Sequence, residues 1–355
     1  MLQVSLVVLA YNVAPYLGVC LKSIECQTLE DFETIIVDDA SVDETAQIAL
    51  AMVDRDPRFR LVRNERNLGT FVSRRIGVAH TRGRYVCIVD GDDWLGPHYL
   101  EHLYKAARSS RADIVECASI AVRPDGRMVP IAQSEVSPSR LDGCAIVEAT
   151  LRRIVWHVNW NKMFDRSLFD QARQQLESID DHIVVADDKL FMLSLMLHAR
   201  SFLRISQVDY FYRIRVGSAT HGVTAKSELR HVEDTMLVDA QLTRLFAPYA
   251  ANPTLLSALA QSHHVELRRI DRIMKRHERH SARRVAIARA ACQLDPDLKD
   301  ILGKPARPAI RFWMALLRSP RDYLRLAMNL ARRLLWLACH GSHVSQIPSQ
   351  VQRPL

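Results

Sequence analysis

The amino-acid sequence predicts an α/β fold built on a doubly wound, mostly parallel β-sheet. Short apolar runs recur at 3–10, 33–37, 59–62 and 85–89. Each run is followed by a stretch with helical spacing of apolar residues, so the strand and helix patterns alternate within about 110 residues. The run at 85–89 is unbroken and rich in β-branched residues, which is typical of a strand buried on both faces of a parallel sheet.

The helices of the first half are expected between these strands. Pro15 suits the first turn of the first helix. Ser41 and Glu44 match a capping box, which predicts that the second helix begins there. The third helix is expected to follow a turn at 67–69, and a fifth strand is expected at 112–118.

The later part of the chain changes pattern twice. A helix is expected at 141–155, and acidic residues precede another at 190–197. Strands at 202–215 are expected to close the sheet, and the periodicity beyond them is helical, which predicts a C-terminal helical extension. The predicted units are 1–118, 119–222 and 223–355.

The composition is that of a soluble globular protein, with 48% hydrophobic and 25% charged residues among 355. Seven scattered cysteines without a C-x-x-C pair indicate a reducing compartment and argue against a disulfide or zinc framework. The N-terminus lacks the basic segment of a signal peptide, and no stretch reaches the ~20 apolar residues of a membrane-spanning helix. We therefore expect a cytoplasmic protein.

The net charge of +8 is concentrated at the end of the chain. Nine of the 48 basic residues and one of the 40 acidic residues fall in 301–355, which leaves 39 of each sign in 1–300. The main domain therefore gives no sign of a nucleic-acid partner. Residues 308–340 combine arginines with apolar and aromatic residues at helical spacing, a pattern typical of helices at membrane interfaces. They could bind the anionic inner face of the plasma membrane, or pack on the domain or on a second subunit of a homo-oligomer.

An acidic turn follows the strand at 85–89. Asp90, Asp92 and Asp93 are three carboxylates within four residues, and such groups repel one another unless a cation or hydrogen-bond donors hold them. Mg²⁺ and Mn²⁺ prefer oxygen ligands and commonly share them with substrate phosphates. The alternative is a polar turn that caps a helix beginning near Pro97.

Other polar side chains are expected at the same edge, because the carboxyl ends of parallel strands lie together. Tyr11 follows the first strand and Asp39 the second. An aromatic ring beside a carboxylate suits a nucleobase, and Arg75 could reach phosphates. The chain has no G-x-G-x-x-G after its first strand and no P-loop, which disfavours a dinucleotide fold and a P-loop enzyme.

Five segments together resemble family 2 glycosyltransferases of the GT-A fold. They are 4–12 (VSLVVLAYN), 35–43 (IIVDDASVD), 67–69 with 74–77 (NLG and RRIG), 89–94 (VDGDDW) and 186–191 (ADDKLF). The last reads Ala-Asp-Asp where the family usually has Gly-Glu-Asp.

The resemblance implies a role for each matching residue. The substrate-binding residues would be Tyr11 and Asp39 at the nucleobase, Arg75 near the base or diphosphate, and Asp90 at the ribose. The metal would be Mg²⁺ or Mn²⁺ on Asp92, with Asp93 able to share it, and Asp188 would be the general base. Residues 1–118 would be the nucleotide-sugar-binding half and 119–222 the acceptor-binding half.

The stretch at 156–162 is an aromatic and polar cluster suited to sugar rings, and the segment at 160–164 (WNKMF) is similar to the family's Trp-Asn-Lys element near the acceptor. Trp160, Asn161 and Lys162 are therefore expected to bind the acceptor; the alternative is that Trp156 and Trp160 belong to the core. His221 is either a further metal ligand or a solvated loop residue.

The resemblance implies an inverting transfer from a nucleoside diphosphate sugar, with UDP-sugars favoured, to an acceptor hydroxyl. A glycan or lipid-linked acceptor is expected, in cell-surface polysaccharide or glycolipid synthesis. Two other functions stay open. A haloacid-dehalogenase-like phosphohydrolase also has an Asp-x-Asp loop, although position 94 is Trp here. A non-catalytic, membrane-associated sugar-nucleotide-binding protein would bind the donor without turning it over.

Overall fold

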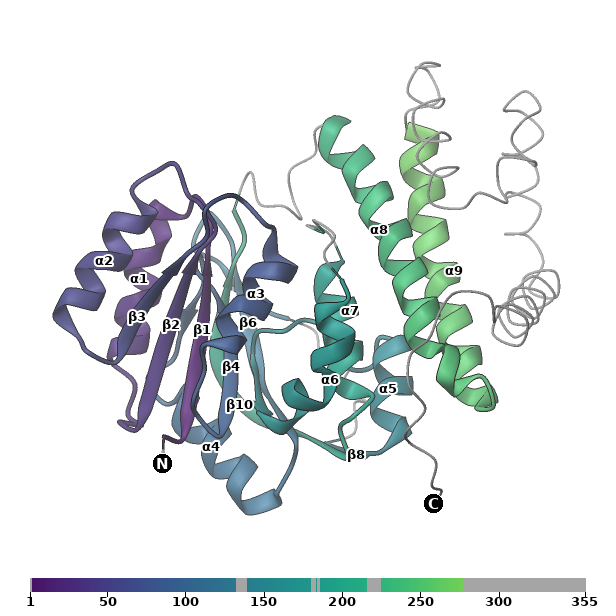
Figure 1. Ribbon diagram of the computed structural model, residues 1–355, viewed down its shortest axis with the longest axis horizontal. Helices are drawn as coiled ribbons and strands as arrows, with labels where there is room; N and C mark the ends of the chain where they lie inside the picture. Colours follow the sequence, from purple (N-terminus) through teal and green to yellow (C-terminus); the bar gives the residue numbers. More distant parts are fainter. Residues whose placement is uncertain (1, 132–138, 180–182, 184–185, 216–224, 277–355) are drawn as a thin grey trace, which may run out of the picture.

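The computed structural model describes residues 2–131, 139–179, 183, 186–215 and 225–276, and one large sheet forms its centre (Figure 1). Its strand order is β3-β2-β1-β4-β9-β6-β10-β5, with β7 paired to β6 and β8 paired to β10. The strands are β1 (Val4–Ala10), β2 (Phe32–Asp38), β3 (Phe59–Arg63), β4 (Tyr85–Asp90), β5 (Trp94–Leu95), β6 (Ile114–Val122), β7 (Met128–Pro130), β8 (Arg140–Asp142), β9 (Lys162–Asp165) and β10 (Ser201–Arg213).

The first four long strands run parallel to one another, as the alternating pattern predicts. β1 lies between β2 and β4, and β2 pairs with β3. The residues of β1, β2 and β4 are almost entirely buried because helices cover both faces of this half, whereas β3 at the edge is only partly buried. β9 runs antiparallel between β4 and β6, and β6 and β10 are again parallel. The predicted α/β class with a mostly parallel GT-A sheet is thereby confirmed.

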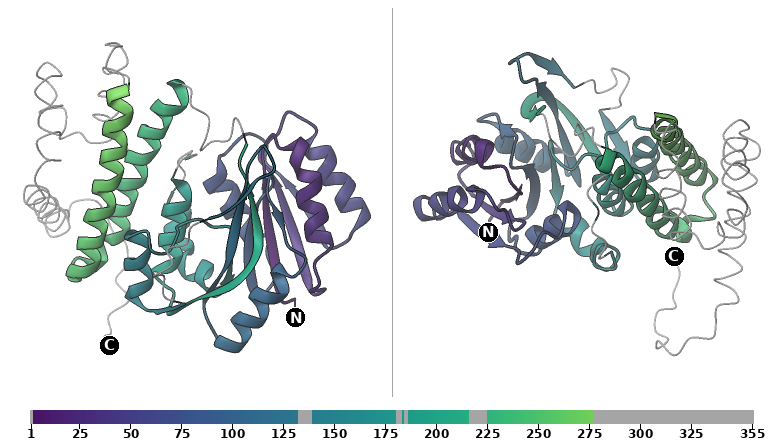
Figure 2. Two further views of the ribbon diagram at one scale, coloured as in Figure 1. Left: turned by 180° about the vertical axis from the view of Figure 1, so that it is seen from behind. Right: turned by 90° about the horizontal axis from the view of Figure 1, so that it is seen from above.

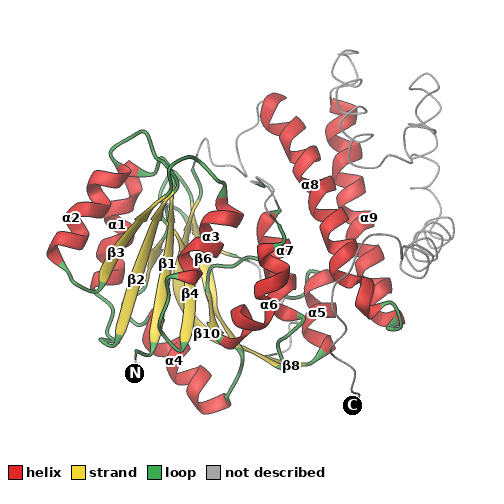
Figure 3. Cartoon of the chain, viewed as in Figure 1, coloured by secondary structure: helices red, strands yellow, loops and turns green. Residues whose placement is uncertain are grey.

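Helices form a layer on each face of the sheet (Figures 2 and 3). α1, α2 and α4 pack on one face, and α3, α5, α6 and α7 pack on the other. The helices are α1 (Ala14–Glu25), α2 (Thr45–Arg55), α3 (Thr70–Ala79), α4 (Tyr99–Ser110), α5 (Cys144–Leu151), α6 (Ser167–Glu177), α7 (Asp187–Met196), α8 (Ala225–Phe246) and α9 (Pro253–Arg276), with a 3₁₀ turn at Ala247–Tyr249.

The C-terminal helices share the core of the sheet domain. Val238, Leu242 and Phe246 of α8 lie in the same buried cluster as Phe191 of α7 and Val7 of β1. The helical character expected after 222 is seen as far as residue 276, while residues 308–340 lie outside the described part. Within that part, no helix combines the length and apolarity needed to cross a bilayer.

Two local predictions are wrong. The capping box does not form, because the Ser41 hydroxyl accepts the N–H of Asn12 (3.0 Å), and α2 begins at Thr45. Thr45 in turn accepts the N–H of Val13 (2.9 Å), so both side chains serve the loop after β1. The helix expected at 141–155 is shorter, because β8 and a Gly143 with φ of 56° precede α5.

Two boundaries also differ from the pattern. The strands expected at 202–215 are one long strand, β10, whose pairing with β6 is irregular between Arg204 and Tyr210. Asp187 and Asp188 do not precede their helix but form the first turn of α7.

Candidate active site

The ends of β2, β1 and β4 bring the predicted site residues to one edge of the sheet. The register sets Ala10 beside Asp38 and Leu9 beside Asp90. The N–H of Gly91 then donates to the carbonyl of Leu9 (2.8 Å). A Cβ on Gly91 would lie 2.8 Å from that oxygen, which explains why glycine separates the two acids.

Asp39 is a buried carboxylate that organises the loop before α3. Its Oδ1 accepts from the Asn64 amide and from the N–H of Leu68 (both 2.8 Å), and its Oδ2 accepts the N–H of Gly69 (2.9 Å). A carboxylate has about four acceptor positions, so one remains for a ligand N–H. Tyr11 follows the neighbouring strand with 45% of its surface exposed, and its ring is therefore available for stacking.

The three acids of the turn have different environments. Asp93 is 1% exposed, and both of its oxygens are used: Tyr210 Oη–H and the N–H of Arg213 donate to them, each at 2.7 Å. Burial raises the pKa of Asp93 well above its ordinary range. Asp92 is partly exposed and accepts from Arg215 Nε at 2.6 Å. The geometry therefore favours Asp92 over Asp93 as a metal ligand.

Asp90 lies where the charges of two acidic segments meet. Burial and the charge of Asp92 raise the pKa of Asp90 to about 7, and the carboxylates of Asp187 and Asp188 add to this rise. The turn after β4 and the first turn of α7 therefore lie close enough to interact, although about 100 residues separate them in the sequence.

The oxygen donors of this edge fit a hard cation such as Mg²⁺ or Mn²⁺. Within the part of the chain that the structure describes, no cluster of three or more His, Cys, Asp or Glu side chains is arranged to hold a metal. The protein would then supply few ligands and leave the others to phosphate and water, as is usual for Mg²⁺. His221 falls outside the described residues.

Two other groups of the site influence Asp188, namely His157 and Arg74. His157 Nε2 lies 4.0 Å from Asp188 Oδ1, and burial lowers the pKa of His157 to about 3, so this imidazole is neutral near pH 7. Burial also raises the pKa of Asp188, while the charge of Arg74 opposes the rise. A carboxylate with a raised pKa and a partly exposed side chain is suited to accept a proton.

The structure brings Arg74, and not the predicted Arg75, to the acids. Arg74 Nη1 pairs with Asp187 Oδ2 at 2.9 Å, and both side chains are buried. Arg75 Nη1 donates to the carbonyl of Leu176 (3.1 Å) at the end of α6, a position that does not favour contact with a base or diphosphate. One signal in the sequence pointed to Arg74. It follows the buried Phe71 by three residues, so the two side chains lie on the same face of α3.

Trp160, Asn161 and Lys162 lie in the interior. Trp160 is 8% exposed and stacks on Tyr210 and Tyr212, with ring centroids 4.8 and 5.4 Å away. The Asn161 amide donates to the carbonyl of Cys117 (2.8 Å), and Lys162 Nζ pairs with Glu116 Oε2 at 2.9 Å. The predicted contacts with an acceptor would require these groups to leave protein partners. Trp156 is the exposed aromatic residue of the segment, at 39%.

We expect Lys162 to contribute to the stability of the fold. Lys162→Met would remove one of the two cations that pair with the fully buried Glu116, the other being Arg204, and breaking such a buried pair costs up to about 3–5 kcal/mol. Urea denaturation of the variant should show a loss of this size. The control is Lys105→Met, which removes an exposed pair with Glu101 and should leave the unfolding free energy nearly unchanged. Equal stability of the two variants would contradict the assignment.

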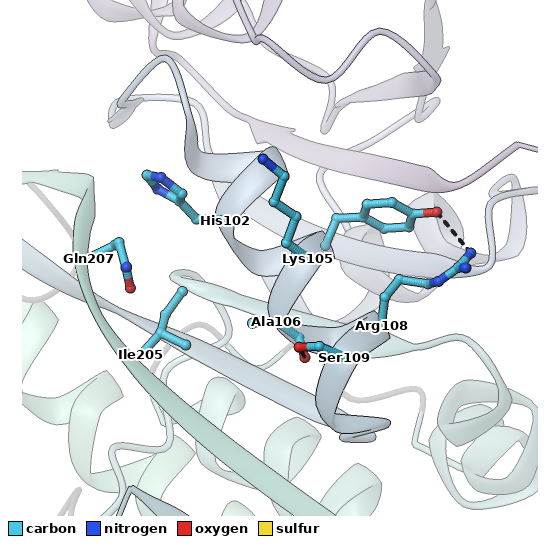
Figure 4. Close-up of a pocket in the computed structure, with 8 residues that line it drawn as sticks. His102, Lys105, Ala106, Arg108, Ser109, Ile205 and Gln207 are labelled. Atoms are coloured by element: carbon cyan, nitrogen blue, oxygen red, sulfur yellow. Dashed lines mark hydrogen bonds between the residues drawn. The ribbon is translucent and has the colours of Figure 1, made fainter.

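A separate hollow of about 820 Å³ lies along α4 and β10 (Figure 4). It contains none of the predicted site residues. Its cations already have partners: Lys105 pairs with Glu101, and Arg108 Nη1 donates to the Tyr104 hydroxyl at 3.3 Å. We therefore place the functional site at the acidic edge and not in this hollow.

Comparisons with known proteins agree with the geometry. The model of glycosyl transferase family 2 matches residues 5–171. The uncharacterized glycosyltransferase EpsJ of Bacillus subtilis is 31% identical over 222 residues, 61% of this chain and 62% of EpsJ. The chain thus spans less than two thirds of that relative.

Two solved structures share the fold. The first is S. aureus TarS 1–349 in complex with UDP-GlcNAc, with a TM-score of 0.54 and 19% identity over 84% of this chain and 92% of TarS. The second is the mannosyltransferase PcManGT from Pyrobaculum calidifontis with GDP-Man and Mn²⁺, with a TM-score of 0.51 and 19% identity over 94% and 87%. Motifs, strand-end geometry and the family match agree: over residues 5–171, the chain belongs to glycosyl transferase family 2.

Proposed function

We propose that the protein transfers a sugar from a nucleoside diphosphate sugar, with UDP-sugars favoured, to an acceptor hydroxyl with inversion. One observation carries the proposal: the register of β1, β2 and β4 brings Tyr11, Asp39 and the acidic turn to one edge of the sheet, where the charges of Asp187 and Asp188 of α7 also reach Asp90. The UDP-GlcNAc complex of TarS, which has the same fold, supports the donor class.

The donor nucleotide lies across the ends of β1, β2 and β4 in this proposal. Tyr11 stacks on the base, and Asp39 accepts a base N–H with the acceptor position that its loop contacts leave free. Asp90 accepts a hydrogen bond from a ribose hydroxyl. Arg75 contacts the donor only if its side chain gives up the hydrogen bond to the Leu176 carbonyl at the end of α6.

Asp92 holds the Mg²⁺ or Mn²⁺ ion in this proposal, and the Mn²⁺ complex of PcManGT supports the choice of cation. When bound, the ion neutralises charge that develops on the departing diphosphate. Arg215 neutralises Asp92 in the structure. Once Asp92 holds a cation, Arg215 is free to pair with phosphate oxygens. Asp93 keeps Tyr210 and the chain at Arg213 in place.

Asp188 accepts the proton of the acceptor hydroxyl as the sugar is transferred. Neutral His157 adds no competing charge beside it. The exposed ring of Trp156, next to His157, is the surface on which an acceptor sugar would stack. In this proposal the buried contacts of Trp160, Asn161 and Lys162 hold this segment in place. A glycan or lipid-linked acceptor of cell-surface polysaccharide or glycolipid synthesis fits these features.

A thermal-shift panel tests the donor class. UDP, GDP, UDP-GlcNAc and GDP-mannose are each added with and without Mn²⁺, because a ligand that binds the native state raises the melting temperature. We expect a UDP species to stabilise the protein mainly when Mn²⁺ is present. Stabilisation by none of the nucleotides, together with hydrolysis of a simple phosphomonoester, would favour the phosphohydrolase.

Tyr11→Ala tests the stacking assignment. Loss of base stacking on an aromatic ring costs about 1–3 kcal/mol, or roughly 5- to 150-fold in the Kd for UDP with Mn²⁺. The fold should survive because Tyr11 is exposed. Calorimetric titration of Trp156→Ala, an equally exposed ring on the acceptor side, is the control and should give the wild-type Kd. An unchanged Kd in Tyr11→Ala would contradict the assignment.

A further inference from the structure

Three successive residues in the first turn of α7 face three different parts of the molecule. Asp187 pairs with Arg74 of α3. Asp188 faces His157 and the charges of the acidic turn. Lys189 reaches the two C-terminal helices. The proposed base thus lies between two neighbours that are each tied to another helix.

Lys189 is a buried ammonium with an unusual set of partners. It is 4% exposed, and its Nζ lies 3.7 Å from Asp239 Oδ1 of α8 and 4.0 Å from Glu266 Oε1 of α9. Among the described residues, Nζ has no hydrogen-bond partner, while the backbone N–H of Lys189 donates to Asp188 Oδ1 at 2.8 Å. Arg153 also pairs with Glu266, and His263 Nδ1 lies 3.8 Å from Asp239 Oδ2.

These contacts are a poor way to gain stability. Removing charges from water carries a penalty that attraction at 3.7–4.0 Å, without hydrogen bonds, offsets only in part. The neighbouring core positions of α7 and α8, among them Leu190 and Val238, are apolar, so the charged cluster is an exception within this interface. The ion pairs instead determine the orientation of the start of α7. They fix the rotation of the first turn of α7, and Asp188 is the preceding residue of that turn.

No side-chain cap holds the start of α7 in place. The residue before it, Ala186, has φ of 61°, and no side chain caps the helix. The orientation of the turn therefore depends on the contacts of Asp187 and Lys189. The positive charge of Lys189 also reaches Asp188 and favours its ionised form.

We propose that Lys189 is a positioning residue: its ion pairs with Asp239 and Glu266 hold Asp188 in place, so that α8 and α9 form part of the catalytic unit. The inference rests on the proposed role of Asp188 as the base. It also implies that a protein truncated at the sequence boundary of 222 would lose the partners of Lys189.

Lys189→Met in the full chain tests the proposal, with Arg152→Met as the matched control. Arg152, the residue after α5, also contacts α9, through Gln261 at 2.7 Å, but it is exposed and makes no described contact with Asp188. We measure the Kd for UDP with Mn²⁺, the rate of UDP release from UDP-GlcNAc, and hydrogen–deuterium exchange of residues 186–196.

Lys189→Met should keep the UDP affinity within about twofold and release UDP on the order of 10- to 100-fold more slowly, the effect of a misplaced catalytic group. Exchange at the start of α7 should become faster. Lys189→Arg, which keeps the charge, should restore most of the rate, and Arg152→Met should match the wild type.

A wild-type rate in Lys189→Met, or parallel losses of UDP affinity and rate, would overturn the proposal. If Lys189→Met does not fold, the double variant Asp239→Asn with Glu266→Gln is used instead, and the same expectations hold. If the wild type binds UDP-GlcNAc without releasing UDP, the proposed function fails, and unchanged exchange at 186–196 in the variant would then overturn the positioning by itself.

Discussion

Asp188→Asn is expected to reduce turnover by about 10²–10⁴-fold while the Kd for UDP with Mn²⁺ stays unchanged. The amide has nearly the shape of the carboxylate but cannot accept the proton of the acceptor hydroxyl. Asp188 lies in the first turn of α7 and makes no described contact at the strand ends assigned to the nucleotide. Rate and affinity are compared in the same protein preparation.

Asp170→Asn is the control for this prediction. Asp170 also stands in the first turn of a helix, α6, but its side chain is 52% exposed, and within the described part of the chain it pairs with Arg173 alone. This variant should keep the wild-type rate. Transfer by Asp188→Asn at the rate of Asp170→Asn would show that Asp188 is not the base.

The pH dependence of turnover gives a second readout of the same residue. Burial raises the pKa of Asp188 above the ordinary aspartate value of 3.8. Because the base must be ionised, the rate should fall as the pH drops through this raised pKa, at a pH above 3.8. Asp188→Asn should lose that acid limb, and a limb that persisted would have to belong to another group.

Asp92→Asn is expected to reduce turnover by about 10²–10³-fold. The remaining activity should no longer depend on the metal ion. The change removes the carboxylate that, in our proposal, holds the cation against the diphosphate. It also leaves Arg215 without its ionised partner. The rate of UDP release is measured against Mn²⁺ concentration, and the variant should respond weakly or not at all.

The matched control is Asp125→Asn, since Asp125 also lies in a turn and pairs with an arginine, Arg127. It should keep the metal response of the wild type. An Asp92→Asn variant with an unchanged Mn²⁺ response would place the ion elsewhere.

The sequence predicted the edge of the sheet well because local pattern decides it. Apolar runs of strand length end at Tyr11, Asp39 and Asp90, and parallel strands must bring their carboxyl ends together. These features depend on a few neighbouring residues and on topology, so they can be predicted without knowledge of side-chain packing.

The site residues that the structure places differently from the sequence pattern depend on which way a side chain points. Successive residues of a helix differ by about 100° in direction, so choosing Arg75 instead of Arg74 changes the partner from Asp187 to a carbonyl of α6. Lys162 carries a charge that suggests a surface site, yet it is buried because Glu116 of β6 meets it there. Such pairings join distant segments, and no local pattern shows them.

The partners of Lys189 are a further case. Asp239 and Glu266 lie 50 and 77 residues after it, in helices that appeared to carry no chemical motif. Their significance depends entirely on the docking of α8 and α9 against α7. The predicted division of the chain at 222 therefore describes a change of pattern, while the core and the ion pairs continue across it.

A crystal structure with UDP and Mn²⁺, read through the anomalous signal of manganese, tests the central claim most directly. We predict one manganese peak between Asp92 and the diphosphate, with the base between Tyr11 and Asp39 and the carboxylate of Asp188 facing the open side of the phosphates. Manganese bound away from Asp92, or a nucleotide bound away from the ends of β1 and β2, would contradict the account.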